Sequence, residues 1–182
     1  VDMKKISRMI VWLAISLLPA CQGIPGKDGL DGDSLLGAVF EIEGDFTPAN
    51  EWMLYFKFPS TFEVFESDAV LVYILWEQAD KLDVWRLLPQ TVVLQEGILQ
   101  YNYDYTLADV QIFLDGSLDL NTLLPAESQD QVFRIVVLPA DFAINNSLEV
   151  SNYNLVVKSL GLDKKAVEKI DLGDTYKINS PD

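Results

Sequence analysis

The feature that most restricts the fold of this chain is a series of short apolar runs separated by turn residues. Residues 38–43 alternate apolar and polar side chains, which is the pattern of a half-buried strand. Residues 69–77, AVLVYILWE, form the most continuous run and therefore predict a central strand that is buried on both faces. Further strands are predicted at residues 51–58, 84–88, 91–95, 98–106, 108–114 and 132–138.

The spacing of these runs determines the fold class that the sequence predicts. The runs recur at short intervals with turn residues between them, and no long helical period lies among them. This arrangement favours an all-β fold, an antiparallel β-sandwich of immunoglobulin-like type, over βαβ units, with a barrel as the second choice. Residues 151–160 predict one short helix near the C-terminus, capped by Ser151 and closed by Gly161. Residues 163–170 are expected to add another helical turn or two, and residues 173–182 a loose tail.

Charge and composition exclude several classes of function. The 182 residues include 28 acidic and 13 basic side chains, a formal net charge of −15. Such a surface repels phosphate backbones, so nucleic-acid binding is not expected. The acidity either serves solubility or favours cations or a basic partner. Histidine is absent, which removes the commonest general base and metal ligand, and the single cysteine excludes an internal disulfide. No metal or other cofactor is expected.

The N-terminal segment predicts export and lipidation. Three basic residues between positions 4 and 8 precede an apolar run at residues 9–18, which is too short to span a bilayer but suits a secretory signal. Leu18-Pro19-Ala20-Cys21 follows and resembles the bacterial lipobox, in which the thiol takes a diacylglycerol and the chain is cut before it. We therefore expect residues 1–20 to be a lipoprotein signal peptide and Cys21 to be the lipid anchor. A buried structural cysteine is the alternative.

Residues 21–36 are expected to hold the folded domain away from the membrane. Residues 23–34 are four Gly-X-Y triplets in register, the pattern of collagen. So short a series favours an extended, polyproline-II-like tether over a triple helix, and its acidic residues lack the distal Glu of a calcium loop. Gln22, where Asp would retain a lipoprotein in the inner membrane, favours the outer membrane by resemblance to enterobacterial sorting. The Lys27-Asp28 pair loosely resembles the export signals of surface lipoproteins.

A family resemblance covers the chain from about Cys21 to Gly161. A lipobox cysteine, a few collagen triplets and the strand pattern that follows resemble the small collagen-like lipoproteins of Bacteroidetes-type bacteria. The matching segments are Val70-Leu71-Val72-Tyr73, Trp85 with Leu87-Leu88-Pro89, Phe133 to Pro139, and Tyr153 with Val157 and Leu160-Gly161. The resemblance implies the architecture and an outer-membrane or cell-surface location, and it implies no active site.

The sequence contains no catalytic motif that the strand pattern would support. GxSxG, a phosphate-cradling glycine loop, CxxC and HExxH are all missing, so the chain is not expected to be an enzyme. The remaining catalytic alternative is a hydrolase with two carboxylates about 5–9.5 Å apart in one cleft.

Aromatic residues are the candidate ligand-binding residues. Tyr101, Tyr103 and Tyr105 alternate along one strand and therefore share a face. An exposed row would be a stacking platform for sugars, whereas the polar residues between them favour burial in the sandwich core. The other candidates are the tryptophans of three different strands, Trp52, Trp76 and Trp85.

These observations predict four segments and one main function. The segments are the signal peptide at 1–20, the lipidated tether at 21–36, the β-sandwich domain at 37–161 and a C-terminal extension at 162–182. The expected function is that of a non-enzymatic, outer-membrane or cell-surface lipoprotein, attached to the membrane through Cys21 and acting as an accessory or protein-interaction module beside another envelope protein or outer-membrane complex. The alternative is a glycan- or peptide-binding lipoprotein that serves an outer-membrane nutrient importer.

Overall fold

The computed structural model describes residues 37–80, 82–139, 142, 148–162 and 167–172. The predicted signal peptide, Cys21, the collagen-like tether and the tail at 173–182 lie outside the described residues. The described residues belong to the predicted β-sandwich domain and to the beginning of the C-terminal extension.

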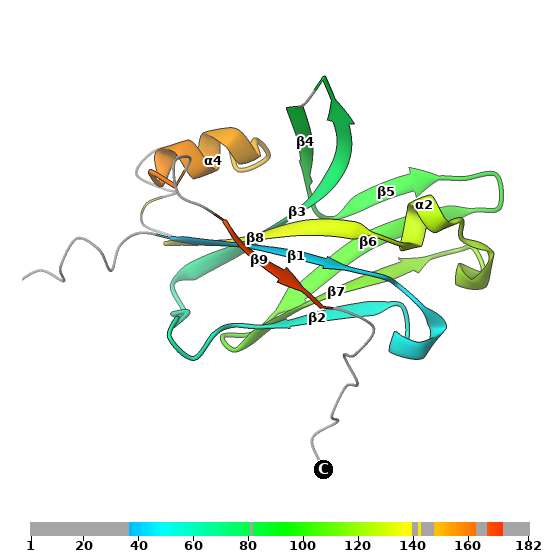
Figure 1. The fold of residues 1–182 in the computed structure, drawn as a ribbon, viewed down its shortest axis with the longest axis horizontal. Helices are drawn as coiled ribbons and strands as arrows, with labels where there is room; N and C mark the ends of the chain where they lie inside the picture. Colours follow the sequence, from blue (N-terminus) through cyan, green and yellow to red (C-terminus); the bar gives the residue numbers. More distant parts are fainter. Residues whose placement is uncertain (1–36, 81, 140–141, 143–147, 163–166, 173–182) are drawn as a thin grey trace, which may run out of the picture. The chain divides into compact units, whose positions relative to one another are not determined.

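The described chain forms two β-sheets (Figure 1), one of five strands in the order β4-β3-β8-β1-β9 and one of four in the order β2-β7-β6-β5. The five-stranded sheet consists of β4 (Leu82–Leu87), β3 (Asp68–Ala79), β8 (Gln131–Pro139), β1 (Ala38–Gly44) and β9 (Glu168–Asp171). The four-stranded sheet consists of β2 (Met53–Lys57), β7 (Asp109–Gly116), β6 (Ile98–Tyr105) and β5 (Gln90–Val93). Among the described strands, neighbours pair antiparallel except β1 and β9, which are parallel.

Short helices connect or flank these strands. The α-helices are α2 (Pro125–Ser128) and α4 (Tyr153–Ser159), and 3-10 turns lie at η2 (Pro48–Asn50) and η3 (Leu120–Thr122). The predicted short helix near the C-terminus is confirmed as α4. Its N-cap is Asn152 rather than Ser151, because the Asn152 side chain accepts a hydrogen bond from the Leu155 N–H. Gly161 follows the helix with φ of 68°, a left-handed conformation that glycine adopts without a Cβ clash.

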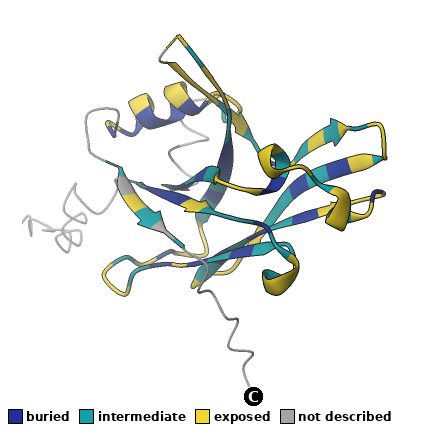
Figure 2. Cartoon of the chain, turned by 45° about the vertical axis from the view of Figure 1, so that its right-hand side comes forward, coloured by how far each residue is buried: buried dark blue, intermediate teal, exposed yellow. Residues whose placement is uncertain are grey.

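The core of the fold lies between the two sheets. Alternate residues of the strands point into this space, as Val70, Val72 and Ile74 do from β3 and Val110 and Ile112 do from β7. Figure 2 shows buried and more exposed residues alternating along the strands. The all-β sandwich that the strand pattern predicts is therefore confirmed. It shares the two-layer architecture of immunoglobulin-like sandwiches, with a strand order of its own.

A second apolar cluster lies on the outer face of the five-stranded sheet. Tyr73 of β3 and Val136 and Leu138 of β8 pack there against Tyr153 and Val156 of α4. Because α4 covers this face, β3 and β8 are buried on both sides along much of their length. This explains the continuous apolar runs of the two strands and confirms the prediction of a central strand at residues 69–77.

The prediction of further helix at residues 163–170 is wrong for its last three residues. Residues 168–170 belong to strand β9, which pairs in parallel with β1, while residues 163–166 lie outside the described residues. The pairing of Phe40 with Glu168 and of Ile42 with Ile170 gives these residues backbone partners that a local helical pattern cannot foresee.

Candidate functional site

The predicted tyrosine row is buried at one end and exposed at the other. Tyr101 is 4% exposed and its hydroxyl donates to the Glu127 carbonyl, whereas Tyr105 is 44% exposed. Between them, the half-buried Tyr103 donates to the Val70 carbonyl. Burial, with a contribution from the charge of Glu127, raises the pKa of Tyr101 to about 12. Two of the three rings therefore belong to the sandwich, and the row does not form an open stacking platform.

The three candidate tryptophans are divided between the two apolar clusters. Trp52 and Trp76 pack against the core between the sheets, and Trp85 packs against the cluster beneath α4. Trp76 stacks with Arg86, whose Cζ lies 4.1 Å from the ring centroid. The structure therefore divides the six aromatic candidates between different parts of the fold, and Trp85 lines a cleft.

This cleft lies where β4, β8 and the start of α4 meet, and it has a volume of about 670 Å³. Trp85 and Arg134 contribute from β4 and β8, and Tyr153 contributes from α4. The Cζ of Arg134 lies 4.0 Å from the Trp85 ring centroid and 4.9 Å from the Tyr153 ring centroid. The two rings are themselves 5.4 Å apart. The guanidinium group and the two rings thus form one packed unit, which we call the Arg134 cluster.

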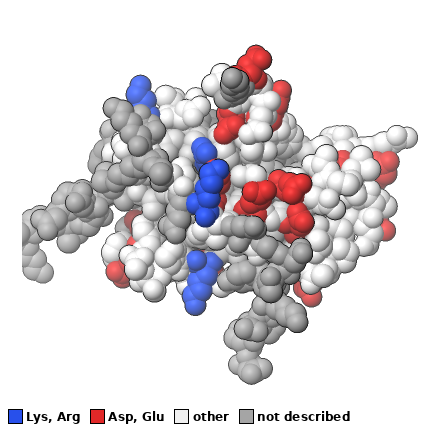
Figure 3. Space-filling model, in the orientation of Figure 1, with Lys and Arg blue, Asp and Glu red and all other residues white. Residues whose placement is uncertain are grey.

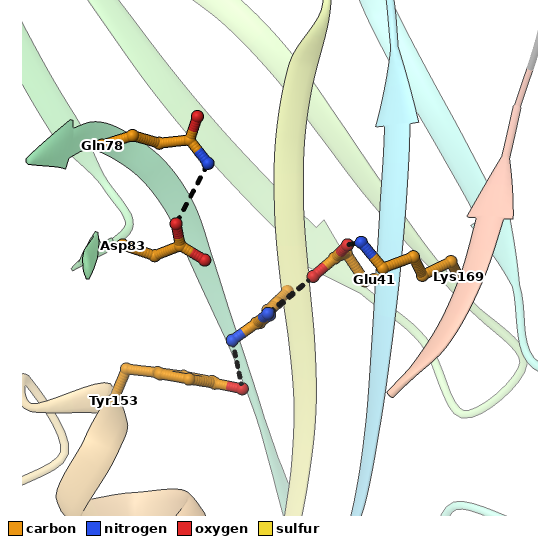
Figure 4. Close-up of polar contacts among 6 residues, drawn as sticks. Glu41, Gln78, Asp83, Tyr153 and Lys169 are labelled. Carbon is orange, nitrogen blue, oxygen red and sulfur yellow. Dashed lines mark hydrogen bonds and ion pairs between the residues drawn. The ribbon is translucent and has the colours of Figure 1, made fainter. Parts of the chain in front are cut away.

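The register of the sheet places charged residues in one row across its outer face. Arg134 of β8 pairs with Glu41 of β1, and Glu41 pairs with Lys169 of β9. Arg134 Nε and Nη2 each lie 2.8 Å from Glu41 Oε2, and Lys169 Nζ lies 2.6 Å from Glu41 Oε1. Arg134 Nη1 donates to the Tyr153 hydroxyl at 2.9 Å. Figure 4 shows Glu41 beside Lys169, with Tyr153 reaching from α4 toward the same face of the sheet.

Burial and neighbouring charges shift the pKa of Glu41 in opposite directions. Glu41 is only 7% exposed, and burial by itself would raise the pKa of its carboxyl group. Hydrogen bonds from Lys169 and Arg134, together with their charges, outweigh this effect and hold the pKa of Glu41 below its ordinary value. Glu41 therefore stays ionised and fixes the guanidinium at the base of the cleft. Burial also raises the pKa of Tyr153, so its hydroxyl remains protonated.

Polar side chains line the rim of the cleft. Asp83 on β4 is exposed, and its Oδ1 accepts a hydrogen bond from Gln78 Nε2 at 3.0 Å. On the opposite side, Ser151, Asn152 and Asn154 lie at the start of α4. The site thus combines rings, one guanidinium group, one carboxylate and uncharged polar groups, a composition that is typical of ligand sites.

The sequence-based reasoning identified Trp85 and missed Arg134, Tyr153 and Asp83. One signal was available. Glu41 and Arg134 are single charges inside the otherwise apolar stretches VFEI and VFRIVVL, and charges buried in this way are paired in folded proteins. Nothing local showed that they pair with each other, because 92 intervening residues separate them in the chain.

The described lining of the cleft offers one guanidinium group, one carboxylate, aromatic rings and uncharged polar side chains. Asp83 is the one carboxylate among the described residues that line it, so no pair of acids faces a substrate there. No group of three or more potential metal ligands is found among the described residues. Within the same part of the chain, no helix is both long and apolar enough to cross a membrane.

The comparisons with known proteins do not assign this chain to a family. Neither protein-family models, nor curated proteins, nor solved structures give a match to this chain. The fold and the cleft together define a β-sandwich with a ligand-sized site on the outer face of one sheet.

Proposed function

We propose that this chain is a lipoprotein of the bacterial outer membrane or cell surface whose β-sandwich is a non-enzymatic binding module. Support for the anchor comes from the lipobox ending in Cys21, and support for the spacing comes from the Gly-X-Y triplets that follow. The cleft lined by Trp85, Arg134 and Tyr153, which we call the Arg134 cleft, is the contact site for another component of the envelope.

The observation that carries the proposal is the fixed geometry of the cleft. Arg134 is held by Glu41 and by Tyr153, and its Cζ lies 4.0 Å from the Trp85 ring centroid. A side chain that is already ordered loses little conformational entropy when a ligand arrives, so such a site gains affinity from its preorganisation.

The anchor is tested by metabolic labelling with a fatty-acid analogue in cells that express the full chain. We expect the wild-type chain to take up the label and to remain with the membrane fraction. A Cys21→Ser chain should do neither. If the Cys21→Ser chain is labelled and membrane-bound, the anchor is assigned to the wrong residue.

The contact site is tested by photo-crosslinking in the same cells. A benzophenone side chain placed at Leu82, an exposed residue at the rim of the cleft, should form a discrete adduct with an envelope component. The matched control carries the same group at Val93, which is exposed on the β5–β6 hairpin and does not line the cleft. Absence of an adduct at Leu82, or equal adducts at both positions, would count against the cleft as the contact site.

A further inference from the structure

Arg134 has hydrogen-bonding capacity that no described residue uses. A guanidinium group carries five N–H donors. Three are engaged, by Nε and Nη2 with Glu41 and by Nη1 with the Tyr153 hydroxyl. The two remaining N–H groups have no acceptor among the described residues, and the side chain is 18% exposed where it lines the cleft. The cleft therefore offers two fixed donors to a ligand.

Asp83 offers an acceptor to the same space. Its Oδ1 accepts from Gln78, and its Oδ2 receives no hydrogen bond from a described residue. Asp83 lies in the lining of the same cleft as Arg134 and Tyr153, whose hydroxyl is 2.9 Å from Arg134 Nη1. Figure 4 shows Asp83 and Tyr153 reaching from different elements toward the same part of the sheet.

The charges of the cleft favour a ligand without net charge. Arg134 and Asp83 oppose each other at the site, and the chain as a whole carries −15. Figure 3 shows acidic and basic side chains on one face of the molecule, and the excess of acidic residues in the chain disfavours the approach of an anionic ligand. A cationic ligand would meet the guanidinium group. A neutral group that both donates and accepts hydrogen bonds meets neither difficulty.

The aromatic surface of the cleft further requires that the ligand has an apolar face. Trp85 is partly exposed, and Arg134 stacks against its ring. Across the cleft, Ser151 and Asn154 are exposed and uncharged. A pyranose ring matches this surface, because it has a C–H face that packs on an aromatic ring and hydroxyl groups that act as donor and acceptor at once. A peptide bound along the edge strand β4 would depend on main-chain hydrogen bonds, whereas the polar groups of Arg134 and Asp83 are side chains.

We propose that the Arg134 cleft binds a neutral saccharide. Adjacent hydroxyl groups of one sugar accept from the two remaining N–H groups of Arg134 and donate to Asp83, and the C–H face of the sugar ring packs on the part of Trp85 that Arg134 leaves exposed. This inference rests on the proposed function as a binding module and names the chemical class of its ligand.

The test measures binding of the purified full-length chain, in detergent, to an array of oligosaccharides. The array contains neutral oligomers of glucose, mannose, galactose and N-acetylglucosamine, together with uronic-acid and sialylated oligomers and arginine- and lysine-rich peptides. We expect binding to a neutral oligomer. With that oligomer, Asp83→Asn should weaken binding about tenfold to a hundredfold, because it removes a charged acceptor from the site. Trp85→Phe should weaken it by a smaller factor.

Controls separate a lost contact from a lost fold. Asp104→Asn changes an exposed carboxylate on β6 outside the cleft and should leave affinity unchanged. The urea midpoint of unfolding of each variant shows whether it is folded under the binding conditions. Asp83 is exposed, so Asp83→Asn is expected to keep the wild-type midpoint.

Three other results would contradict the ligand class, the site or the proposed function. Binding to charged oligomers or to peptides alone, lost in Asp83→Asn, overturns the neutral saccharide and leaves the binding module standing. Neutral binding that Asp83→Asn and Asp104→Asn change equally overturns the assignment to this cleft. Absence of any binding, with no adduct from the crosslinker at Leu82, overturns both the ligand class and the proposed function.

Discussion

Two arginine–tryptophan stacks lie on opposite sides of the same β3–β4 hairpin. In one, Arg86 of β4 lies 4.1 Å from the ring centroid of Trp76 of β3. In the other, Arg134 of β8 lies 4.0 Å from the ring centroid of Trp85 of β4. Trp76 packs against the core between the sheets, and Trp85 packs against the cluster beneath α4. Judged by the distance from cation to ring, the two pairs are equivalent.

They differ in what else each arginine touches. Arg86 is exposed and has no ion pair with a described residue. Arg134 bonds the buried Glu41 and the hydroxyl of Tyr153. A cation over an aromatic ring at the surface contributes little, whereas removing the partner of a buried carboxylate leaves a charge without compensation. We infer that the contribution of such a pair to stability depends on the counter-ion of the arginine and on its burial rather than on the stacking distance.

The largest difference is expected on removal of the two arginines. Arg134→Leu should lower the free energy of unfolding by about 3 kcal/mol, because Glu41 keeps only the exposed Lys169 as its partner. Arg86→Leu should lower it by less than about 1 kcal/mol. Urea unfolding of both variants measures the two losses. Equal losses would show that the stack rather than the ion pair governs stability.

A smaller loss is expected when both members of the buried pair are replaced. The double variant Glu41→Leu, Arg134→Leu should lose about 1–2 kcal/mol, less than Arg134→Leu alone, because no charge is left buried without a partner. Urea unfolding of the Glu41→Leu single variant beside these two completes a double-mutant cycle. If the double variant is less stable than the single one, the Glu41 carboxylate does not require its partner.

The pH dependence of stability should distinguish the buried carboxylate from exposed ones. The folded-state pKa of Glu41 lies below its ordinary value of 4.5, so its contribution is present above that pH and is lost as the pH falls through the folded pKa. The difference in unfolding free energy between the wild-type chain and Glu41→Gln should therefore shrink below about pH 4.5. Glu43→Gln, two residues along the same strand and exposed, is the matched control. Parallel curves for the two variants would contradict this prediction.

The smallest effect is expected at the exposed end of the row. Lys169 is 77% exposed in its side chain, so water and salt screen its bond to Glu41. Lys169→Ala should therefore destabilise the fold less than Arg134→Leu does, and the loss should shrink further at high salt. Unfolding midpoints at low and high salt measure this difference. A loss that salt does not change would show that the ammonium group is effectively buried.

Much of the fold could be predicted because strand formation leaves a local pattern. The alternation in AVFEIE and the continuous run AVLVYILWE correspond to β1 and β3, and the segment after Ser151 corresponds to α4. One local signal was misleading. Residues 168–170 form β9 because β1 offers a free edge, which no local pattern reveals.

The sequence by itself determined which residues form strands and which face of each strand is apolar, because side chains alternate with a period of two along any strand. It did not determine the site. Asp83, Arg134 and Tyr153 are distant in the chain, and only the order β4-β3-β8 and the packing of α4 on the outer face bring them to one cleft. Likewise, Glu41 and Arg134 become a pair only through the register of β1 with β8. Sheet order, strand register and the position of the covering helix depend on contacts between residues that are distant in the chain. These contacts determine which polar side chains lie together in the cleft.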